Sequence, residues 1–349
     1  MVSGKFQDLL RCVDGSERAR QPFRDWSELW IFTGTRCNLV CNGCYTESSP
    51  RNASFHFITL EQAARFLEEA RELGIPKICY TGGEPFYNPD FPAILERTIA
   101  LGFDCLVLTN LTKPYESRGR ALVLEQVRQG RPLHIRASLD HPDRAVHDEH
   151  DLDEATIARY PVPDPSLDGG RSHWFETGFN RGKGSFERTV NHLLELARDA
   201  GTVSVAGRAP SGVTGKLFHA YAEETEGRFR AFFRESGLPG ELPLKIFPDI
   251  GARRDADVPE ITEHRCRTLI PPSVFDGLMC NVTRMVAVPA TADGKPNDTP
   301  LVFPCTIVPD NPTMALGRTL RESATRDTYL ADPRCYRFCI AGGASCSES

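Results

Sequence analysis

The sequence predicts an α/β fold, a partial TIM-like (β/α)6 barrel followed by a small C-terminal cysteine-rich β-hairpin/helix extension. Two observations lead to this fold class. Short apolar segments alternate with longer segments whose apolar residues recur at helical spacing, as in right-handed βαβ units around a parallel sheet. Cysteines, glycines and polar residues directly follow several of the apolar segments, and the C-terminal ends of parallel strands carry the chemistry in such folds.

The six expected strands all lie before residue 250. They occupy residues 28–33, 77–81, 103–109, 133–139, 203–206 and 242–247. The expected helices between them occupy residues 59–73, 91–100, 122–129, 185–198 and 219–236. We therefore expect a lead-in at residues 1–28, a barrel at residues 29–250 and a separate extension at residues 251–349.

The composition is that of an ordinary globular protein, with 40% hydrophobic and 25% charged residues in 349. A net charge of −6 gives no reason to expect nucleic acid or an anionic membrane as a partner. No apolar run reaches the ~20 residues of a membrane span, and residues 1–21 lack the apolar core of a signal peptide. Twelve cysteines in an unexported chain point to metal binding in a reducing compartment, so we expect a cytoplasmic protein.

The most informative segment holds Cys37, Cys41 and Cys44, with Tyr45 directly after them. Three thiols this close on one loop suit zinc or an iron–sulfur cluster. Structural zinc usually takes four closed ligands, so three local cysteines favour a cubane with one iron left open. A disulfide is disfavoured because three cysteines pair badly and no secretory signal precedes them.

This CxxxCxxC segment, followed by an aromatic residue, resembles the cluster motif of the radical S-adenosylmethionine (SAM) enzymes. The resemblance implies that Cys37, Cys41 and Cys44 bind a 4Fe–4S cluster. It also implies that the amine and carboxylate of SAM chelate the open iron and that Tyr45 contacts the cofactor.

The segment Gly82–Pro85 follows the second expected strand. Its two glycines let the backbone approach a ligand closely. It resembles the GGEP segment of radical SAM enzymes, which contacts the methionyl amine of SAM. Asn110 follows the third strand at the place of the family's TNG segment, although Leu111 replaces the glycine. The resemblance thus implies cofactor-binding roles for Gly82, Gly83, Glu84 and Asn110.

Ser138 and Asp140 close the fourth strand and resemble the family's SLDG segment, where polar side chains meet the ribose of SAM. His141 stands in place of the glycine, and both polar residues also suit a helix cap or a turn. Arg208 follows the fifth strand. It is expected to meet the SAM carboxylate or a substrate, or else to be an ordinary surface arginine.

An insertion rich in Asp, Pro and Gly interrupts the pattern at residues 151–180. A lid or substrate-contacting loop and a tolerated surface insertion both explain it. The histidines and aspartates of residues 141–151 raise the possibility of a mononuclear metal site, but a solvated helix start explains their charges without any ligand role. Asp143, His147, Asp148 and the segment 181–186 resemble a stretch common beside the fourth strand in the peptide-modifying branch of the family.

Six cysteines lie after residue 263, around an expected hairpin of strands at residues 282–289 and 301–303. This arrangement resembles the SPASM and Twitch extensions, which carry auxiliary 4Fe–4S clusters. Six thiols are too few for two such clusters, so we expect one. Its expected ligands are Cys280 and Cys305, with two more from Cys335, Cys339 and Cys346 and with Cys266 in reserve. A zinc knot is the alternative.

The resemblance implies an enzyme that reductively cleaves SAM to a 5′-deoxyadenosyl radical and removes hydrogen from a C–H bond. An auxiliary cluster favours an oxidised product, or else binds or orients the substrate. Peptide or protein maturation is the commonest use of this architecture, so the resemblance implies oxidation or crosslinking of a peptide or protein substrate. Oxidation or rearrangement of a small molecule such as a sugar or aminocyclitol is the second reading, and a non-catalytic zinc-binding protein is the third. No catalytic side chain is assigned.

The expected partners follow from this chemistry. An electron donor such as flavodoxin or ferredoxin must supply the electron. Only 36 residues precede Cys37, so recognition of a precursor leader would need a separate protein.

Overall fold

The structure is a computed structural model. It describes residues 4–163, 172–198, 203–213, 215–249, 258–269, 278–291, 293–297, 299–308 and 311–341. Cys346 and parts of the expected insertion and extension lie outside these described residues.

Six strands form the parallel sheet that the sequence predicts, and they lie in the sheet in chain order. They are β2 (Glu28–Phe32), β4 (Lys77–Thr81), β5 (Asp104–Thr109), β6 (Leu133–Ser138), β7 (Val203–Arg208) and β8 (Leu244–Phe247). The sheet curves but does not close, since β8 is a terminal strand of the sheet. The predicted α/β class with a partial parallel barrel is confirmed.

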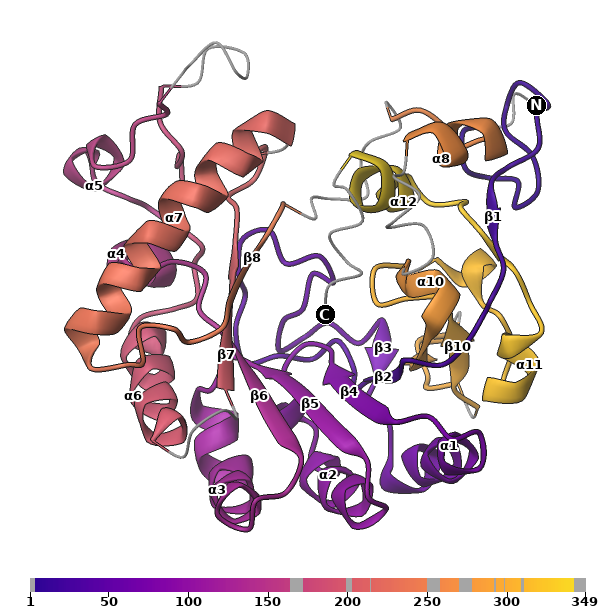
Figure 1. The fold of residues 1–349 in the computed structure, drawn as a ribbon, viewed down its shortest axis with the longest axis horizontal. Coiled ribbons are helices and arrows are strands. Elements are labelled where there is room, and N and C mark those ends of the chain that lie inside the picture. The colour runs from indigo at the N-terminus through magenta and orange to yellow at the C-terminus, as the bar shows by residue number, and fades with distance from the viewer. Residues whose placement is uncertain are drawn as a thin grey trace.

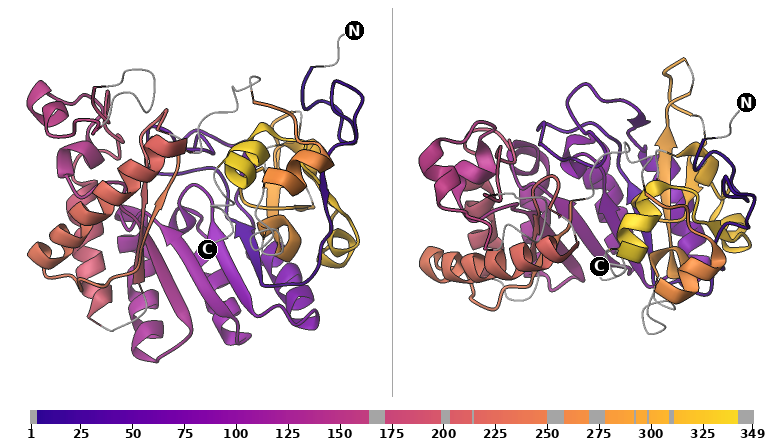
Figure 2. Two further views of the ribbon diagram at one scale, coloured as in Figure 1. Left: turned by 45° about the horizontal axis from the view of Figure 1, so that its top comes forward. Right: turned by 90° about the horizontal axis from the view of Figure 1, so that it is seen from above.

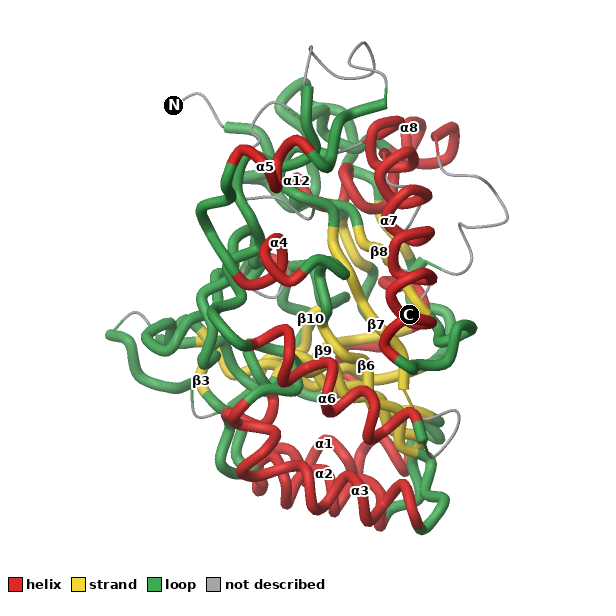
Figure 3. Tube along the Cα trace, turned by 90° about the vertical axis from the view of Figure 1, so that its left-hand side faces the viewer, coloured by secondary structure: helices red, strands yellow, loops and turns green. Residues whose placement is uncertain are grey.

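Helices cover the outer, convex face of the sheet (Figures 1 and 3). They are α1 (Leu60–Glu72), α2 (Phe91–Ala100), α3 (Arg120–Arg128), α6 (Ser185–Ala197) and α7 (Gly215–Ser236). Thr59 caps α1 through a capping box with Gln62, and the helix buries its predicted apolar stripe from Ala63 to Ala70 against the strands. Shorter helices, α4 (Arg144–Asp148) and α5 (Glu154–Ala158), follow β6.

The C-terminal hairpin joins the same sheet, although the sequence indicated a separate extension. β9 (Thr283–Pro289) pairs in parallel with β2, and β10 (Leu301–Phe303) and β3 (Phe55–His56) pair antiparallel with β9. All five residues of β2 are buried, so this strand is suited to the interior of a sheet with neighbours on both sides. The expected domain boundary near residue 250 stays a prediction.

Short elements surround this hairpin and form the lobe opposite α7 (Figure 2). They are α8 (Glu263–Leu269), α10 (Met279–Val282), α11 (Leu320–Ala324), α12 (Pro333–Cys335) and the two-stranded sheet of β1 (Arg20–Gln21) with β11 (Thr328–Tyr329). Short 3-10 and π turns occupy Pro85–Tyr87, Tyr115–Gly119, Pro312–Met314 and Tyr336–Ala341.

The described part of the insertion is packed rather than loose. Tyr160, Trp174, Phe175 and Phe179 are buried and belong to the main hydrophobic core. Trp174 also donates a hydrogen bond from Nε1 to Glu224 on α7 at 2.9 Å. The aromatic residues therefore anchor the insertion to the barrel. Among the described residues, no helix combines the length and the apolar character needed to cross a membrane.

Candidate active site

A cavity of about 200 Å³ lies at the C-terminal ends of the parallel strands. One side of its wall is the cysteine loop, defined here as residues 37–45, together with the residues that follow β4 to β7. Ten residues singled out from the sequence line it: Cys37, Cys41, Cys44, Tyr45, Gly82, Gly83, Asn110, Ser138, Asp140 and Arg208. The fold thus brings together five segments of the chain. Which of these residues bind a ligand stays a prediction.

The thiols of the cysteine loop receive hydrogen bonds from neighbouring N–H groups. Leu39 donates its backbone N–H to Cys37 Sγ at 3.4 Å, and Asn110 Nδ2 lies 3.8 Å from the same sulfur. The backbone N–H of Ser48 donates to Cys44 Sγ at 3.4 Å. Hydrogen bonds of this kind are found at cysteines that ligate iron–sulfur clusters and tune their potentials.

Charge around the loop also suits an anionic cluster. Burial raises the pKa of the Cys41 thiol, while the positive charges of Arg181 and Arg208 act in the opposite direction. Within the described ranges, no three His, Cys, Asp or Glu side chains converge so as to share a single metal ion. A cubane does not need such convergence, since each cysteine binds a different iron. The donor set therefore fits a cluster held by three cysteines.

Gly82 and Gly83 have a packing reason to be glycine. A Cβ on Gly83 would lie 2.3 Å from the carbonyl oxygen of Arg36, and one on Gly82 would lie 2.7 Å from that of Gly34. Gly82 also has a φ of +146°, which side-chain-bearing residues rarely adopt. The turn after β4 lies directly against the chain that enters the cysteine loop, leaving no space for a side chain between them.

Glu84 is placed behind the cavity wall and is not one of its lining residues. Its carboxylate accepts hydrogen bonds from the backbone N–H of Asn110 and from Thr109 Oγ1, both at 2.8 Å. Burial raises the pKa of Glu84 to about 7, although these hydrogen bonds act to lower it. The geometry gives Glu84 a positioning role that joins the loops after β4 and β5, and its predicted cofactor-binding role stays a prediction.

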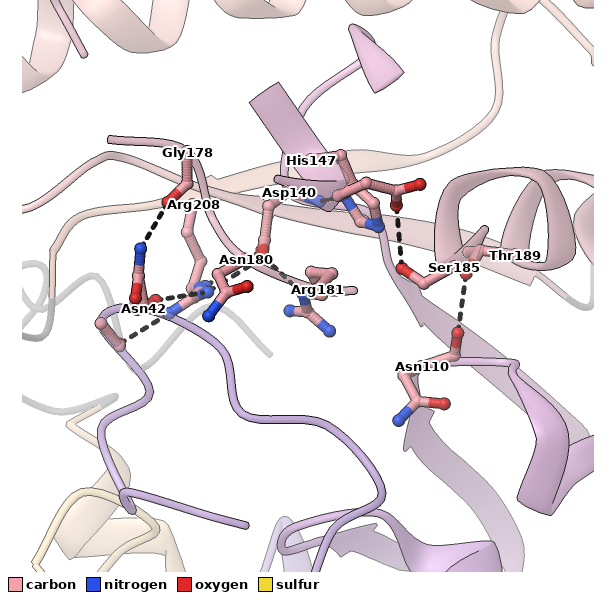
Figure 4. A network of polar contacts seen from close by, with 12 residues as sticks. Asn42, Asn110, Asp140, His147, Gly178, Asn180, Arg181, Ser185, Thr189 and Arg208 are labelled. Carbon is pink, nitrogen blue, oxygen red and sulfur yellow. Dashed lines mark hydrogen bonds and ion pairs between the residues drawn. The ribbon is translucent and has the colours of Figure 1, made fainter. Parts of the chain in front are cut away.

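Asp140 is fully buried between two arginines (Figure 4). Arg208 donates to both carboxylate oxygens, at 3.0 and 2.9 Å, and Arg181 donates from Nε at 2.6 Å. Burial alone would raise the pKa of Asp140, but the two guanidinium groups outweigh it and hold that pKa well below its usual range. The carboxylate is thus ionised and engaged by protein groups.

Arg208 links Asp140 to the cysteine loop. Its Nη1 donates to the carbonyl oxygen of Gly43 at 2.6 Å, and its Nη2 donates to that of Asn42 at 3.2 Å. The end of the insertion supports the same loop, since Asn42 Nδ2 donates to the Gly178 carbonyl at 2.7 Å and Asn180 Nδ2 to the Val40 carbonyl at 3.2 Å (Figure 4). Arg208 is therefore no ordinary surface arginine, and the insertion reaches the site.

Arg181 was not predicted as a site residue, yet it lines the cavity. The only available signal was its position at the start of the segment 181–186, which the sequence linked to the family without a role. Arg136 and Trp30 also line the cavity from the inner face of the sheet and were missed. Both lie inside strands, where sequence alone does not distinguish a cavity-facing side chain from a packed one.

Among the described residues, the buried histidines near β6 do not converge with other side chains on one metal ion. His141 and His147 accept backbone N–H groups at Nδ1, and no described group is a hydrogen-bond partner of their Nε2 atoms. Burial lowers the pKa of each to about 3, so both are neutral at physiological pH. Asp148 instead caps α6, accepting the N–H groups of Gly184 and Phe186 at 2.9 Å. These polar groups act within the protein.

The C-terminal cysteines gather behind the opposite wall of the cavity. Cys266, Cys280, Cys335 and Cys339 are buried in one hydrophobic cluster, with Cys305 packed against it. Burial raises the pKa of Cys335, and negative charge on Cys305 and Cys280 would raise it further, so these three thiols lie near one another. Their chain neighbours line the cavity: Met279, Thr306 and Phe338.

Comparison with known proteins is consistent with this geometry. Residues 31–160 match the model of the Radical SAM superfamily. A probable GTP 3′,8-cyclase of Methanocella arvoryzae is 33% identical over 34% of this chain and 36% of its own length. An AdoMet-dependent heme synthase of Oleidesulfovibrio alaskensis is 28% identical over 32% of this chain and 28% of its own length. The match thus spans about a third of the length of each of these relatives.

The crystal structure of Streptococcus suis SuiB bound to S-adenosylmethionine has a TM-score of 0.50 and 12% identity, covering 84% of this chain and 63% of that one. At this identity the likeness concerns the fold alone. The matched segment begins in β2 and contains the cysteine loop, the glycine turn after β4, Asn110 and Asp140. Residues 31–160 are therefore similar to the Radical SAM superfamily, and the rest of the chain lies outside this match.

Proposed function

We propose that this protein is a radical SAM enzyme whose reaction takes place in the cavity beside the cysteine loop. The observation that carries the proposal is the convergence of Cys37, Cys41 and Cys44 with the loops after β4, β5 and β6 on one cavity. When bound, a 4Fe–4S cluster and SAM supply a 5′-deoxyadenosyl radical that removes hydrogen from a C–H bond.

The chain's own residues bind and position these groups. The three cysteines hold the cluster, and Gly82 and Gly83 present backbone amide groups without a side chain in the way. Asn110, Ser138 and Tyr45 line the cavity at the predicted positions for SAM. Asp140 holds Arg208 and Arg181 in place, and those two cations face the cofactor site. The C-terminal lobe covers one side of the cavity, which helps to exclude water from the reaction.

The first experiment is anaerobic. The cluster is reconstituted, dithionite and SAM are added, and 5′-deoxyadenosine is measured by mass spectrometry. Wild-type protein and a Cys105→Ala control, which alters a buried cysteine on the outer side of β5, are expected to form it. Cys41→Ala is expected to form none. Iron-loaded wild-type protein that forms no 5′-deoxyadenosine would refute the proposal.

We also propose one auxiliary 4Fe–4S cluster, held by four of the C-terminal cysteines, with Cys280, Cys305 and Cys335 among them. Their gathering next to the cavity wall supports it. A cluster there would accept an electron from the substrate after hydrogen removal, leaving an oxidised product. Equal amounts of iron and sulfide, in excess of one cluster, would support this site. Zinc in their place would favour the zinc-knot alternative.

For the substrate, we propose a peptide or protein that is oxidised or crosslinked in the cytoplasm. The supporting observation is that the insertion contacts the cysteine loop. A substrate peptide that binds to the insertion could therefore position the cysteine loop. A small-molecule substrate is the second candidate, favoured by the cavity's volume of about 200 Å³ and by the two relatives named as a cyclase and a synthase. Faster SAM cleavage with a peptide encoded beside the gene, compared with GTP or sugars, separates the two.

A further inference from the structure

A second pocket of about 450 Å³ lies on the outer side of the cysteine loop, and its lining is strongly basic. Five cationic side chains line it, and its lining contains no aspartate or glutamate: Lys113, Arg118, Arg181, Lys183 and Arg188. This is notable in a chain of net charge −6, whose remaining surface is on balance acidic. We refer to these lining residues as the basic pocket.

Several of these cations are not neutralised by a carboxylate. Within the part of the chain that the structure describes, Lys113 and Lys183 are exposed and form no ion pair. Arg118 donates to the carbonyl oxygens of Phe86 and Tyr87, which are neutral acceptors and do not compensate its positive charge. Arg188 and Arg181, in contrast, are paired with carboxylates, Arg188 with Glu116 at 3.0 Å and Arg181 with Asp140 at 2.6 Å. The basic pocket therefore presents uncompensated positive charge to solvent.

Two residues form the wall shared by the basic pocket and the predicted cluster site. Leu39 and Arg181 line both the basic pocket and the inner cavity. Leu39 also donates its backbone N–H to Cys37 Sγ at 3.4 Å. Asn38, which lines the basic pocket as well, donates from Nδ2 to Thr112 Oγ1 at 3.0 Å. A molecule bound in the basic pocket would therefore contact Asn38 and Leu39, which are next to the predicted cluster ligand Cys37 in the chain.

Two further features favour a protein over a small anion at this pocket. The first backbone N–H groups of α6, which would form an anion-binding helix end, are already taken by Asp148. Beside Leu39, the side chain of Val40 is 59% exposed on the loop. An exposed apolar residue on a polar surface is a common element of protein–protein contacts.

We propose that the basic pocket is the docking surface for an acidic one-electron carrier protein of the flavodoxin or ferredoxin class. This rests on the proposed function, because a cluster at Cys37, Cys41 and Cys44 must be reduced from outside. In the docked complex the carrier is oxidised by one electron and the cluster is reduced by one electron, with no atom or proton transferred. The acidic remainder of the surface repels such a carrier, so attraction is concentrated beside the cluster.

The test uses reconstituted holoprotein and reduced flavodoxin, with two readouts: flavodoxin binding at equilibrium and the stopped-flow rate of cluster reduction. Lys113→Glu and Lys183→Glu are each expected to weaken binding and slow reduction by about tenfold at low salt. Lys183→Arg should behave like wild type. Raising the ionic strength should slow the wild type towards the variants, because screening removes the attraction.

Arg131→Glu is the matched control. It makes the same charge change on an exposed cation before β6, at the opposite end of the strands, and should leave both readouts unchanged. Dithionite-driven formation of 5′-deoxyadenosine should be equal in all variants, which separates this proposal from the proposed function. Unchanged flavodoxin kinetics in Lys183→Glu would overturn the docking surface. So would pyrophosphate binding that requires Lys183 while flavodoxin kinetics stay unaffected, since that identifies a small-anion site.

Discussion

Asp140 connects two arginines of the candidate site through its two carboxylate oxygens, with no exposure to solvent. At the scale of a single residue, both arginines depend on Asp140. If its charge were removed, the two largely buried guanidinium groups would lose their counter-charge together. Removing one member of a buried ion-paired group typically costs about 3–5 kcal/mol.

We expect Asp140→Asn to lower the free energy of unfolding by roughly 3 kcal/mol, measured by urea denaturation of the cluster-free protein. The matched control is Asp327→Asn, which breaks the exposed pair with Arg20 and should cost less than about 1 kcal/mol. Equal losses in the two variants would contradict a special role for the buried carboxylate.

The same residue predicts an acid dependence of stability. The pKa of Asp140 in the folded protein lies below its ordinary value of 3.8, because the arginines outweigh the effect of burial. Its stabilisation is therefore fully present above that value and is lost as the pH falls below it. The difference in unfolding free energy between wild type and Asp140→Asn should be constant from about pH 7 to 5 and shrink below about pH 4. A difference unaffected by acid would refute this assignment.

Sequence reasoning at this scale identified positions better than roles. The motif residues Asn110, Ser138, Asp140 and Arg208 do line one cavity, since each lies at or just after the C-terminal end of a parallel strand. The partners of Asp140 were not predictable, because Arg181 lies 41 positions away and reaches it only through the packing of the insertion. Motif resemblance also does not reveal that Glu84 lies behind the wall.

At the scale of elements, the turn after β4 is limited by backbone contact. Gly83→Ala would place a methyl group 2.3 Å from the Arg36 carbonyl oxygen, so the turn or the entry to the cysteine loop must move. We expect at least a tenfold loss of SAM affinity by equilibrium dialysis on the reconstituted protein, or roughly 1.4 kcal/mol.

Gly227→Ala is the comparison for this variant. Gly227 lies inside α7 with nothing within 4 Å of an added Cβ. Its replacement should raise the free energy of unfolding by about 0.5–1 kcal/mol through helix propensity and leave SAM affinity unchanged. If Gly83→Ala were equally harmless, close packing of the turn would not be the reason for glycine.

The insertion gives a second prediction at the same scale. Trp174 is buried against Tyr221, with ring centroids 5.3 Å apart, and it donates a hydrogen bond to Glu224. Trp174→Ala should therefore cost about 3–5 kcal/mol of unfolding free energy. The exposed neighbour Thr177 offers a contrast, and Thr177→Ala should change stability by less than about 0.5 kcal/mol. A small effect of the tryptophan substitution would restore the reading of a tolerated surface insertion.

Element prediction succeeded where periodicity and turn signals agreed. The strand Lys77–Thr81 and the helix Phe91–Ala100 have the predicted bounds. The insertion was read only as a break in the pattern, because its aromatic residues show no period and gain their meaning from α7 and the cysteine loop, far away in sequence.

At the scale of the whole molecule, two groups of cysteines flank one cavity. Full reconstitution should give roughly eight irons per chain, corresponding to two 4Fe–4S clusters. Cys280→Ser and Cys335→Ser should each retain roughly four, and Cys105→Ser, on the outer side of β5, should retain all of them. Iron and sulfide assays measure this. Full iron content in Cys335→Ser would remove that residue from the ligand set.

The cysteines of the last hundred residues predicted a C-terminal extension around a hairpin, but they did not predict how this hairpin pairs with the barrel sheet. Local patterns predict a strand and its turn, whereas the choice of β2 as a parallel neighbour depends on which sheet edge remains open after six strands have paired. Alternation along the chain carries no information about that edge.

The pairing of β2 with β9 has a consequence for how the protein is made. The two strands are joined at Glu28 and Thr283, 255 positions apart. While a nascent chain is still being translated, β2 therefore lacks one neighbour and presents an apolar edge of the kind that pairs with other chains. The cysteine loop follows this strand directly. We therefore expect the cysteine loop to reach its final position only after β9 has covered this edge of β2.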